Sequence, residues 1–349
     1  MYDLFMKNTI KNKIYQMFIL GLEGTELKNN PNLKNALQEG LGGVIFFTQN
    51  IKTAPQIKDL IKNIKKESKI PPFLSIDQEG GRVERTENIH GGKKYLSAKF
   101  AAEKGKDFLK TQTTQIALEL KDLGFNLNFA PCLDVNTNPD NPIIGERAFS
   151  NTPDKVIKFG QIVAKTYLEN GIIPCGKHFP GHGDTSIDSH VSLPKIDLSL
   201  EEMEKSHIKP FKKVQTPMIM VAHLHCTAFD REEIPSSLST NVLNYLRKKL
   251  NYKGLIITDD MIMGAIGQKA KYKKQNEDSV HCSPLTAQSI QAIKAGVNIL
   301  LYRNSNDETI EIIENLAKMA KYDEVLRENI ESSYNKIIDF KKSLHFSKF

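Results

Sequence analysis

The sequence has no tryptophan, and its four cysteines (Cys132, Cys175, Cys226 and Cys282) occur singly along 349 residues. Isolated cysteines form no C-x-x-C pair, which excludes the common zinc-ribbon and thiol-redox motifs. Three of the four lie in or beside apolar runs. We therefore expect buried free thiols and a reducing compartment.

Long apolar segments are missing as well. The first 13 residues have no apolar core of signal-peptide length, and the run Met17–Leu22 is too short to cross a membrane. The net charge of +7 is spread over helical patterns, and no basic segment is interleaved with stacking aromatics. These features predict a cytoplasmic protein that neither inserts into membranes nor binds nucleic acid, and they leave its oligomeric state open.

Short apolar runs alternate with helical patterns from end to end of the chain. Near-continuous apolar runs are typical of parallel strands that are covered on both faces. The expected strands are Gln16–Leu22, Gly43–Phe47, Pro72–Ile76, Asn126–Ala130, Ile172–Gly176, Met218–Ala222, Leu255–Thr258 and Val297–Leu301.

Eight such strand–helix units predict one α/β domain over residues 1–349, a (β/α)8 TIM-type barrel with a closing helix at about 323–345. A doubly wound open sheet is the alternative. It would need a glycine fingerprint for phosphate after the first strand, and Gly21–Gly24 does not provide one.

Polar residues follow the expected strands at their carboxyl ends, where barrel enzymes place their active sites. Asp77 follows the third strand, Asp134 the fourth, His223 the sixth, and Asp259 with Asp260 the seventh. The fifth strand leads into a segment rich in histidine, glycine and proline, Lys177–His190. Because glycine and proline disfavour a helix there, we expect a loop with a chemical role.

Two of these places predict acid, base or nucleophile chemistry. A carboxylate at the mouth of a barrel strand, as at Asp259, can attack an electrophilic carbon, whereas Asp260 is expected to cap the next helix. In an extended loop Asp188 and His190 project to the same side, so the carboxylate can orient the imidazole and raise its pKa. His190 would then donate a proton near neutral pH.

A metal site is the competing interpretation of the histidine-rich segment. His178 and His182 are four residues apart, and with Asp184 they could bind a metal ion from a loop, although the H-E-x-x-H pattern is missing. Arg147 and Lys177 are cations suited to sugar hydroxyls or carboxylates. His207 and His345 are expected on solvated helix faces.

With these residues assembled, the sequence resembles glycoside hydrolase family 3, and within it the β-N-acetylhexosaminidases of the NagZ type. The resemblance covers nearly the whole chain, in the family's order. Its motifs are Ile76–Val83 (IDQEGGRV), Ala130–Asn136 (APCLDVN), Gly145–Ser150 (GERAFS), Lys177–Thr185 (KHFPGHGDT), Asp188–His190 (DSH) and Thr258–Met261 (TDDM) with Met263–Ala265 (MGA).

The resemblance implies a (β/α)8 barrel and retaining hydrolysis of terminal, non-reducing β-N-acetylglucosaminyl residues, with no cofactor and no metal. By motif position Asp259 is the nucleophile and His190 the acid/base, with Asp188 as its partner. The residues implied to contact the sugar are Asp77, Arg85, Arg147, Lys177 and His178.

The implied substrate is a carbohydrate, such as a peptidoglycan fragment in cell-wall recycling. A retaining glycosidase needs a nucleophile and a proton donor on either side of the glycosidic bond. A histidine acid/base becomes neutral after donating its proton, so it repels anionic groups less than a carboxylate would. Phosphorolysis by the same site is therefore an alternative to hydrolysis. The polar segment 268–283 is longer than in the family, and its role is open.

Overall fold

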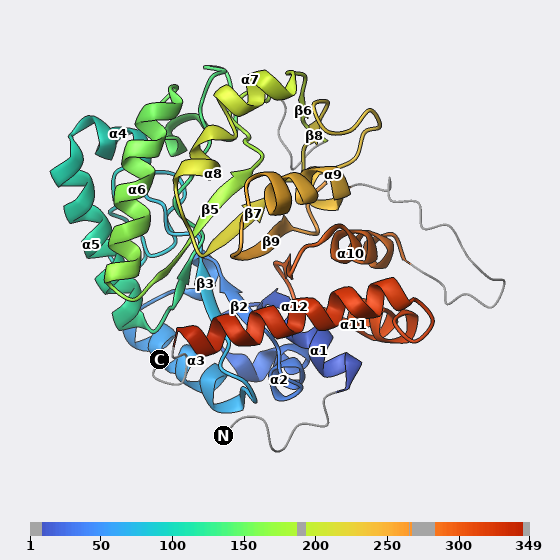
Figure 1. The fold of residues 1–349 in the computed structure, drawn as a ribbon. Helices are drawn as coiled ribbons and strands as arrows, with labels where there is room; N and C mark the ends of the chain where they lie inside the picture. The colour runs from blue at the N-terminus through green and yellow to red at the C-terminus, as the bar shows by residue number, and fades with distance from the viewer. Residues whose placement is uncertain (1–8, 187–192, 265, 267–282, 345–349) are drawn as a thin grey trace.

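The eight expected strands form one closed parallel barrel, in the order β1-β10-β9-β7-β5-β4-β3-β2 around the ring. The computed structural model describes residues 9–186, 193–264, 266 and 283–344 (Figure 1). Its barrel strands are β1 (Phe18–Gly21), β2 (Gly43–Phe46), β3 (Phe73–Ile76), β4 (Leu127–Asn128), β5 (Ile173–Phe179), β7 (Met218–Val221), β9 (Leu255–Asp260) and β10 (Ile299–Tyr302). The predicted (β/α)8 fold is confirmed.

Helices surround the barrel and cover the outer faces of its strands (Figure 1). They are α1 (Ile10–Gln16), α2 (Pro31–Gln38), α3 (Ala54–Glu67), α4 (Ala98–Glu103), α5 (Lys106–Leu123), α6 (Pro153–Glu169), α7 (Leu200–Lys205), α8 (Lys209–Lys213), α9 (Thr240–Asn244), α10 (Pro284–Ala295), α11 (Asp307–Met319) and α12 (Glu324–Ser343). In α3 the stripe Ile57, Leu60, Ile61 and Ile64 is buried, as its spacing of three and four residues requires. A short parallel pair, β6 (Lys195–Ile196) and β8 (His225–Cys226), lies outside the barrel.

Strand boundaries differ from the expected ones in ways that matter for the site. Gln16 ends helix α1, so the first strand begins at Phe18 rather than at Gln16. Strand β5 continues to Phe179, which places Lys177 and His178 on the strand, and the loop starts after them. Strand β9 likewise includes both Asp259 and Asp260. Side chains on strands are held more rigidly than side chains on loops.

The segment 200–213 forms two short helices, α7 and α8. His207 lies between them and is buried, so the expectation of a solvated His207 is wrong. Its ring packs against Gly181, where a Cβ atom would come within 2.6 Å of the His207 Cβ. His345 and most of the polar segment 268–283 lie outside the described residues.

Helix α12 packs against α1 and α10 (Figure 1) and carries a buried lysine, Lys341. The Lys341 ammonium donates to Gln16 Oε1 (3.1 Å) and to the carbonyl oxygens of Gly42 and Pro71 (2.9 Å each). It also lies 4.6 Å from the centre of the Phe73 ring. Gly42, Pro71 and Phe73 lie at the amino-terminal ends of β2 and β3. Helix α12 therefore packs against the amino-terminal end of the barrel, away from the carboxyl ends of the strands.

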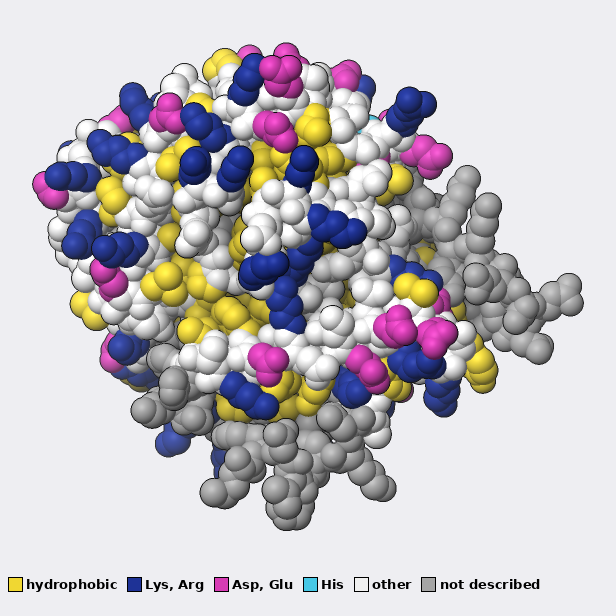
Figure 2. Space-filling view, in the orientation of Figure 1, with side chains coloured by type: hydrophobic (Ala, Val, Ile, Leu, Met, Phe, Trp, Pro, Cys, Tyr) yellow, Lys and Arg dark blue, Asp and Glu magenta, His cyan; other side chains and the backbone are white. Residues whose placement is uncertain are grey.

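The surface agrees with the spread of charge in the sequence. Figure 2 shows Lys and Arg side chains distributed over this face with Asp and Glu among them. Among the helices that the structure describes, none combines the length and the hydropathy of a membrane span. Cys132, Cys175 and Cys226 are buried free thiols, as expected, and Cys282 lies outside the described residues.

Candidate active site

A cavity of about 410 Å³ opens at the carboxyl ends of the barrel strands. Asp77 follows β3, Lys177 and His178 end β5, and Asp259 ends β9, and all four line this cavity. Arg85 and Arg147, from the loops after β3 and β4, line it as well. The structure therefore gathers the predicted nucleophile and all five predicted sugar-contacting residues in one place.

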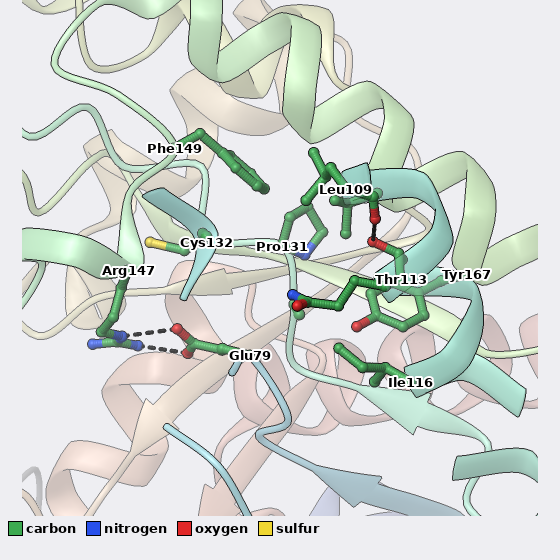
Figure 3. Close-up of a pocket in the computed structure, with 13 residues that line it drawn as sticks. Glu79, Leu109, Thr113, Ile116, Pro131, Cys132, Arg147, Phe149 and Tyr167 are labelled. Carbon is green, nitrogen blue, oxygen red and sulfur yellow. Dashed lines mark hydrogen bonds and ion pairs between the residues drawn. The ribbon is translucent and has the colours of Figure 1, made fainter. Parts of the chain in front are cut away.

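Four charged side chains form a compact, nearly neutral cluster on the wall of this cavity. Lys177 Nζ lies 2.7 Å from Asp77 Oδ1 and 2.6 Å from Glu79 Oε1. Arg147 holds Glu79 through two parallel hydrogen bonds, from Nε (2.9 Å) and Nη2 (2.8 Å), drawn in Figure 3. Burial alone would raise the pKa of Glu79, but Arg147 and Lys177 hold it far below its usual range.

This cluster fixes the orientation of two cations that would otherwise be flexible. The buried Lys177 ammonium keeps its charge because Asp77 and Glu79 raise its pKa against the effect of burial. The bidentate geometry likewise defines the plane of the Arg147 guanidinium. A second cavity of about 30 Å³, lined by Glu79, Tyr167 and Thr113 among others, lies behind the pair (Figure 3). It has room for one water molecule.

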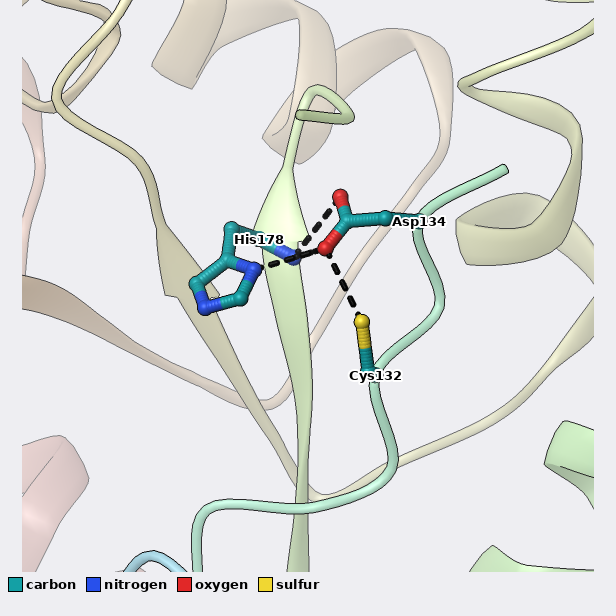
Figure 4. A group of neighbouring side chains, drawn as sticks. All are labelled: Cys132, Asp134 and His178. Atoms are coloured by element: carbon teal, nitrogen blue, oxygen red, sulfur yellow. Dashed lines mark hydrogen bonds and ion pairs between the residues drawn. The ribbon is translucent and has the colours of Figure 1, made fainter. Parts of the chain in front are cut away.

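Asp134 orients the ring of His178 through a hydrogen bond. Its Oδ2 lies 2.6 Å from His178 Nδ1 and accepts a weaker hydrogen bond from the Cys132 thiol at 3.1 Å (Figure 4). Because a carboxylate accepts, the His178 proton lies on Nδ1. On the other side Arg147 Nη2, which can only donate, lies 3.3 Å from Nε2. When the ring is neutral, Nε2 accepts this hydrogen bond from Arg147.

His182 lies in the loop after β5, and it is buried beside His178. Its backbone N–H donates to Asp134 Oδ1 at 2.6 Å, and its Nδ1 lies 2.8 Å from the Thr185 hydroxyl. Burial and the neighbouring His178 lower the pKa of His182 to about 4, so its ring is neutral at neutral pH. A Cβ at Gly183 would collide with the carbonyl of Val135, so this loop requires glycine to pack against the segment after β4.

The metal trio considered from the sequence does not form. Among the described residues, the ligand atoms of His178, His182 and Asp184 are not a group lying within 4.8 Å of one another, whereas those of Cys132, Asp134 and His178 are. Asp184 instead accepts a hydrogen bond from the Thr137 hydroxyl at 2.7 Å. In the group that does form, burial raises the pKa of the Cys132 thiol. The Cys132 S–H and the His178 Nδ1–H both donate to Asp134 Oδ2. The group is thus internally satisfied by hydrogen bonds.

Asp259 is held ionised at the end of β9. Its Oδ1 accepts the backbone N–H of Asp260 at 2.8 Å. Burial opposes ionisation, but the rings of His178 and His223, this N–H and Lys177 together lower the pKa of Asp259. His223 donates from Nε2 to the Asp260 carbonyl (3.1 Å) and accepts from the Ser237 hydroxyl (2.7 Å). The backbone N–H and the backbone carbonyl of Asp260, the residue after the predicted nucleophile, are therefore both held by hydrogen bonds.

Asp260 behaves differently from its neighbour. Its Oδ1 accepts the N–H groups of Ile262 and Arg303 (3.2 Å each), and its Oδ2 lies 3.3 Å from Arg303 Nε. Burial raises the pKa of Asp260 to about 6. The expectation that Asp260 caps a following helix is wrong, because it joins the end of β9 to the residue after β10.

Arg85 follows β3, and its guanidinium carbon lies 5.7 Å from the centre of the Phe47 ring. Its buried Nε has no hydrogen-bond partner among the described residues, and Arg85 lines the cavity. Asp188 and His190, the predicted acid/base pair, lie outside the described residues. Their assignment stays a prediction.

Several supporting residues were not identified as such from the sequence. Glu79 stands inside the DQEGG motif, but its pairing with residues from β5 and the β4 loop requires the barrel. Arg303 follows an apolar run with no motif around it. Its position directly after a barrel strand could have identified Arg303, because polar residues at the carboxyl ends of barrel strands face the active site.

Comparison with known proteins agrees with this geometry. The family model described as the glycosyl hydrolase family 3 N terminal domain matches residues 9–340. The chain belongs to glycosyl hydrolase family 3. A family 3 protein of known structure, a β-N-acetylglucosaminidase from Paenibacillus sp. str. FPU-7, superposes with a TM-score of 0.85 at 28% identity, covering 97% of this chain and 63% of that one.

Curated relatives of this family 3 chain carry the name β-hexosaminidase. Beta-hexosaminidase A of Pseudoalteromonas piscicida is 32% identical over 334 residues, which cover 87% of this chain and 54% of the relative. Beta-hexosaminidase of Haemophilus influenzae (strain ATCC 51907 / DSM 11121 / KW20 / Rd) is 29% identical over 306 residues, covering 85% of this chain and 82% of the relative. The chain thus spans about half of the first relative and most of the second.

Proposed function

We propose that this family 3 chain is a retaining exo-β-N-acetylglucosaminidase. The observation that carries the proposal is that an ionised carboxylate, Asp259, lines the same cavity as the charged cluster of Asp77, Arg147 and Lys177. A retaining glycosidase needs a carboxylate nucleophile at the anomeric carbon of a sugar held by directional polar groups. The names of the relatives support N-acetylglucosamine as that sugar.

The proposed reaction assigns one role to each of these groups and to the predicted pair of His190 and Asp188. Asp259 attacks C1 of the sugar, and the leaving oxygen takes a proton from His190, oriented by Asp188. Asp259 and C1 are then joined as an ester. Neutral His190 next takes a proton from water, whose oxygen attacks C1 and returns the carboxylate of Asp259. Lys177, Arg85, Arg147 and His178 hold the sugar hydroxyls and its acetamido group meanwhile.

The leaving group is proposed to be a peptidoglycan fragment, cleaved in the cytoplasm during cell-wall recycling. Once His190 has donated its proton it is neutral, so it repels a departing acidic aglycone less than a carboxylate would. Phosphorolysis is the second candidate, and the same charge argument favours it.

The test uses 4-nitrophenyl β-N-acetylglucosaminide and a fluorinated glycoside that traps the intermediate. Asp259→Asn should lower kcat by at least about 10³-fold, and His190→Ala should lower it severely. Mass spectrometry of the trapped protein should find the sugar on Asp259. Label on another residue, or wild-type rates in both variants, contradicts the assignment. Unchanged activity in a chelator would exclude a metal-dependent hydrolase.

A further inference from the structure

Among the residues that the structure describes, more positive than negative side chains line the cavity. Five cationic residues line it (Arg82, Arg85, Arg147, Lys177 and Arg303), against three carboxylates (Asp77, Asp259 and Asp260). Counting Glu79 with the carboxylates, because it pairs with two of these cations, still leaves one positive charge in excess. A neutral sugar does not compensate such an excess, whereas an anionic ligand does.

Partners already exist for most of these cations. Lys177 and Arg147 are paired in the buried cluster, and Arg82 donates both terminal nitrogens to the backbone carbonyls of Pro142 and Ile143. Arg303 differs. Its Nε faces Asp260 Oδ2, its side chain is 51% exposed, and its two terminal nitrogens have no partner among the described residues. These nitrogens can therefore bind a ligand without breaking a contact to the described part of the chain.

The fold places Arg303 beside the reacting carbon. Strands β9 and β10 are neighbours in the barrel, and Leu301 pairs with Asp260. Arg303 is anchored twice to Asp260, the residue after the nucleophile, through its backbone N–H and its side chain. The sugar-contacting residues come from β3 to β5, on the other side of the ring of strands. Arg303 therefore lies at the C1 end of a sugar bound there.

We propose that Arg303 forms an oxyanion-binding subsite on the leaving-group side of Asp259. Its ligand is a carboxylate carried by the aglycone or an inorganic phosphate that takes the place of water. A guanidinium offers parallel N–H donors that match either oxyanion. The inference rests on the proposed glycosidase function and adds a residue that selects the aglycone or the acceptor.

The phosphate step is balanced without a further reactant. An anionic oxygen of hydrogen phosphate attacks C1 of the glycosyl ester, and the bond from C1 to the Asp259 oxygen breaks with its electron pair. The products are N-acetylglucosamine 1-phosphate and the free carboxylate of Asp259. No proton transfer is needed, because the attacking oxygen is already deprotonated.

The first arm of the test compares two disaccharides, N-acetylglucosaminyl-β-1,4-N-acetylglucosamine and N-acetylglucosaminyl-β-1,4-N-acetylmuramic acid. The two differ in that the leaving sugar of the muramic acid disaccharide carries an additional lactyl carboxylate. If Arg303 binds this carboxylate, Arg303→Met should lower the ratio of kcat/KM, acidic over neutral, by about tenfold or more, because the charged hydrogen bond to the aglycone is lost. Arg303→Lys should lower this ratio less.

The second arm measures N-acetylglucosamine 1-phosphate formed from the neutral disaccharide in phosphate, against chloride of equal ionic strength. Arg303→Met should remove this product if phosphate is the ligand. Arg327→Met, which removes an exposed charge from α12, is the matched control and should change neither arm.

The outcomes separate the two proposals. A response in the first arm identifies an aglycone carboxylate as the ligand, and a response in the second identifies phosphate. If Arg303→Met changes both disaccharides by the same factor and wild-type protein forms no sugar phosphate, the subsite is refuted while the glycosidase function stands. If wild-type protein cleaves neither disaccharide nor an aryl glycoside, the proposed function itself has failed.

Discussion

Replacing Glu79 by glutamine tests the charged cluster with a nearly isosteric change. Glu79 accepts hydrogen bonds from Arg147 and an ion-pair contact from Lys177, and all three side chains are largely buried. The variant leaves two buried cations facing only one carboxylate, Asp77. A glutamine also turns an NH₂ group toward at least one of these cations, because its two terminal atoms are not both acceptors.

The expected magnitude follows from the burial. Removing one partner of a buried ion pair costs ~3–5 kcal/mol, because the remaining charge lies uncompensated in a medium of low polarity. A control with the same separation exists at the surface. Lys11 and Glu314 are also 2.6 Å apart, but their side chains are 38% and 39% exposed, compared with 2% and 5% for Lys177 and Glu79. Glu314→Gln should cost less than ~1 kcal/mol.

Denaturant unfolding at pH 7, followed by circular dichroism, measures both variants against the wild type. We expect Glu79→Gln to be the less stable variant by several kcal/mol and to lose activity on the aryl glycoside through misplaced Arg147 and Lys177. Comparable free energies of unfolding for Glu79→Gln and Glu314→Gln would refute the reasoning, since burial would then not determine the cost.

Two further predictions concern Asp134 and Lys341. Asp134→Asn should lower kcat/KM about 10- to 100-fold, because His178 loses a hydrogen bond to a charged acceptor that contributes ~1.5–3 kcal/mol. Cys132→Ala removes only the weaker contact to the same carboxylate, so its kcat/KM should stay within about tenfold of the wild type. Equal losses in the two variants would contradict this ranking. Burial lowers the pKa of Lys341 from its ordinary 10.5 to about 7, so between these values the unfolded chain binds a proton that the folded chain lacks, and stability should rise with pH. The free energy of unfolding of the wild type relative to Lys341→Met should therefore climb by about 1.4 kcal/mol per pH unit over this window, and a difference independent of pH would disprove the shift.

The barrel could be predicted from the sequence because its strands are almost uniformly apolar. Each run such as Gly43–Phe46 or Leu255–Ile257 is buried on both faces, which leaves an unbroken apolar signature. Strand ends were harder to predict. Lys177, His178, Asp259 and Asp260 are polar yet lie on strands, because the inner face at the carboxyl end of a barrel points into the cavity rather than into the core.

The members of the candidate site could be listed from local motifs, but their partners could not. The predicted sugar-contacting residues lie in recognisable motifs and line one cavity. The contacts of Glu79 with Lys177 and of Asp134 with His178 join residues 98 and 44 positions apart, and such pairs depend on strand order. His207 was placed wrongly for the same reason, since a helical pattern does not reveal that Gly181 packs against it.

The division of the cavity between β3–β5 and β9–β10 has a consequence for protein engineering. Residues on the first side share ion pairs, so a library that varies Asp77, Glu79, Arg147 or Lys177 singly would produce mostly unstable clones. Arg303 is half exposed and is tied to one carboxylate. Mutagenesis aimed at new acceptors should therefore begin at the end of β10, where changes are least coupled to recognition of the sugar.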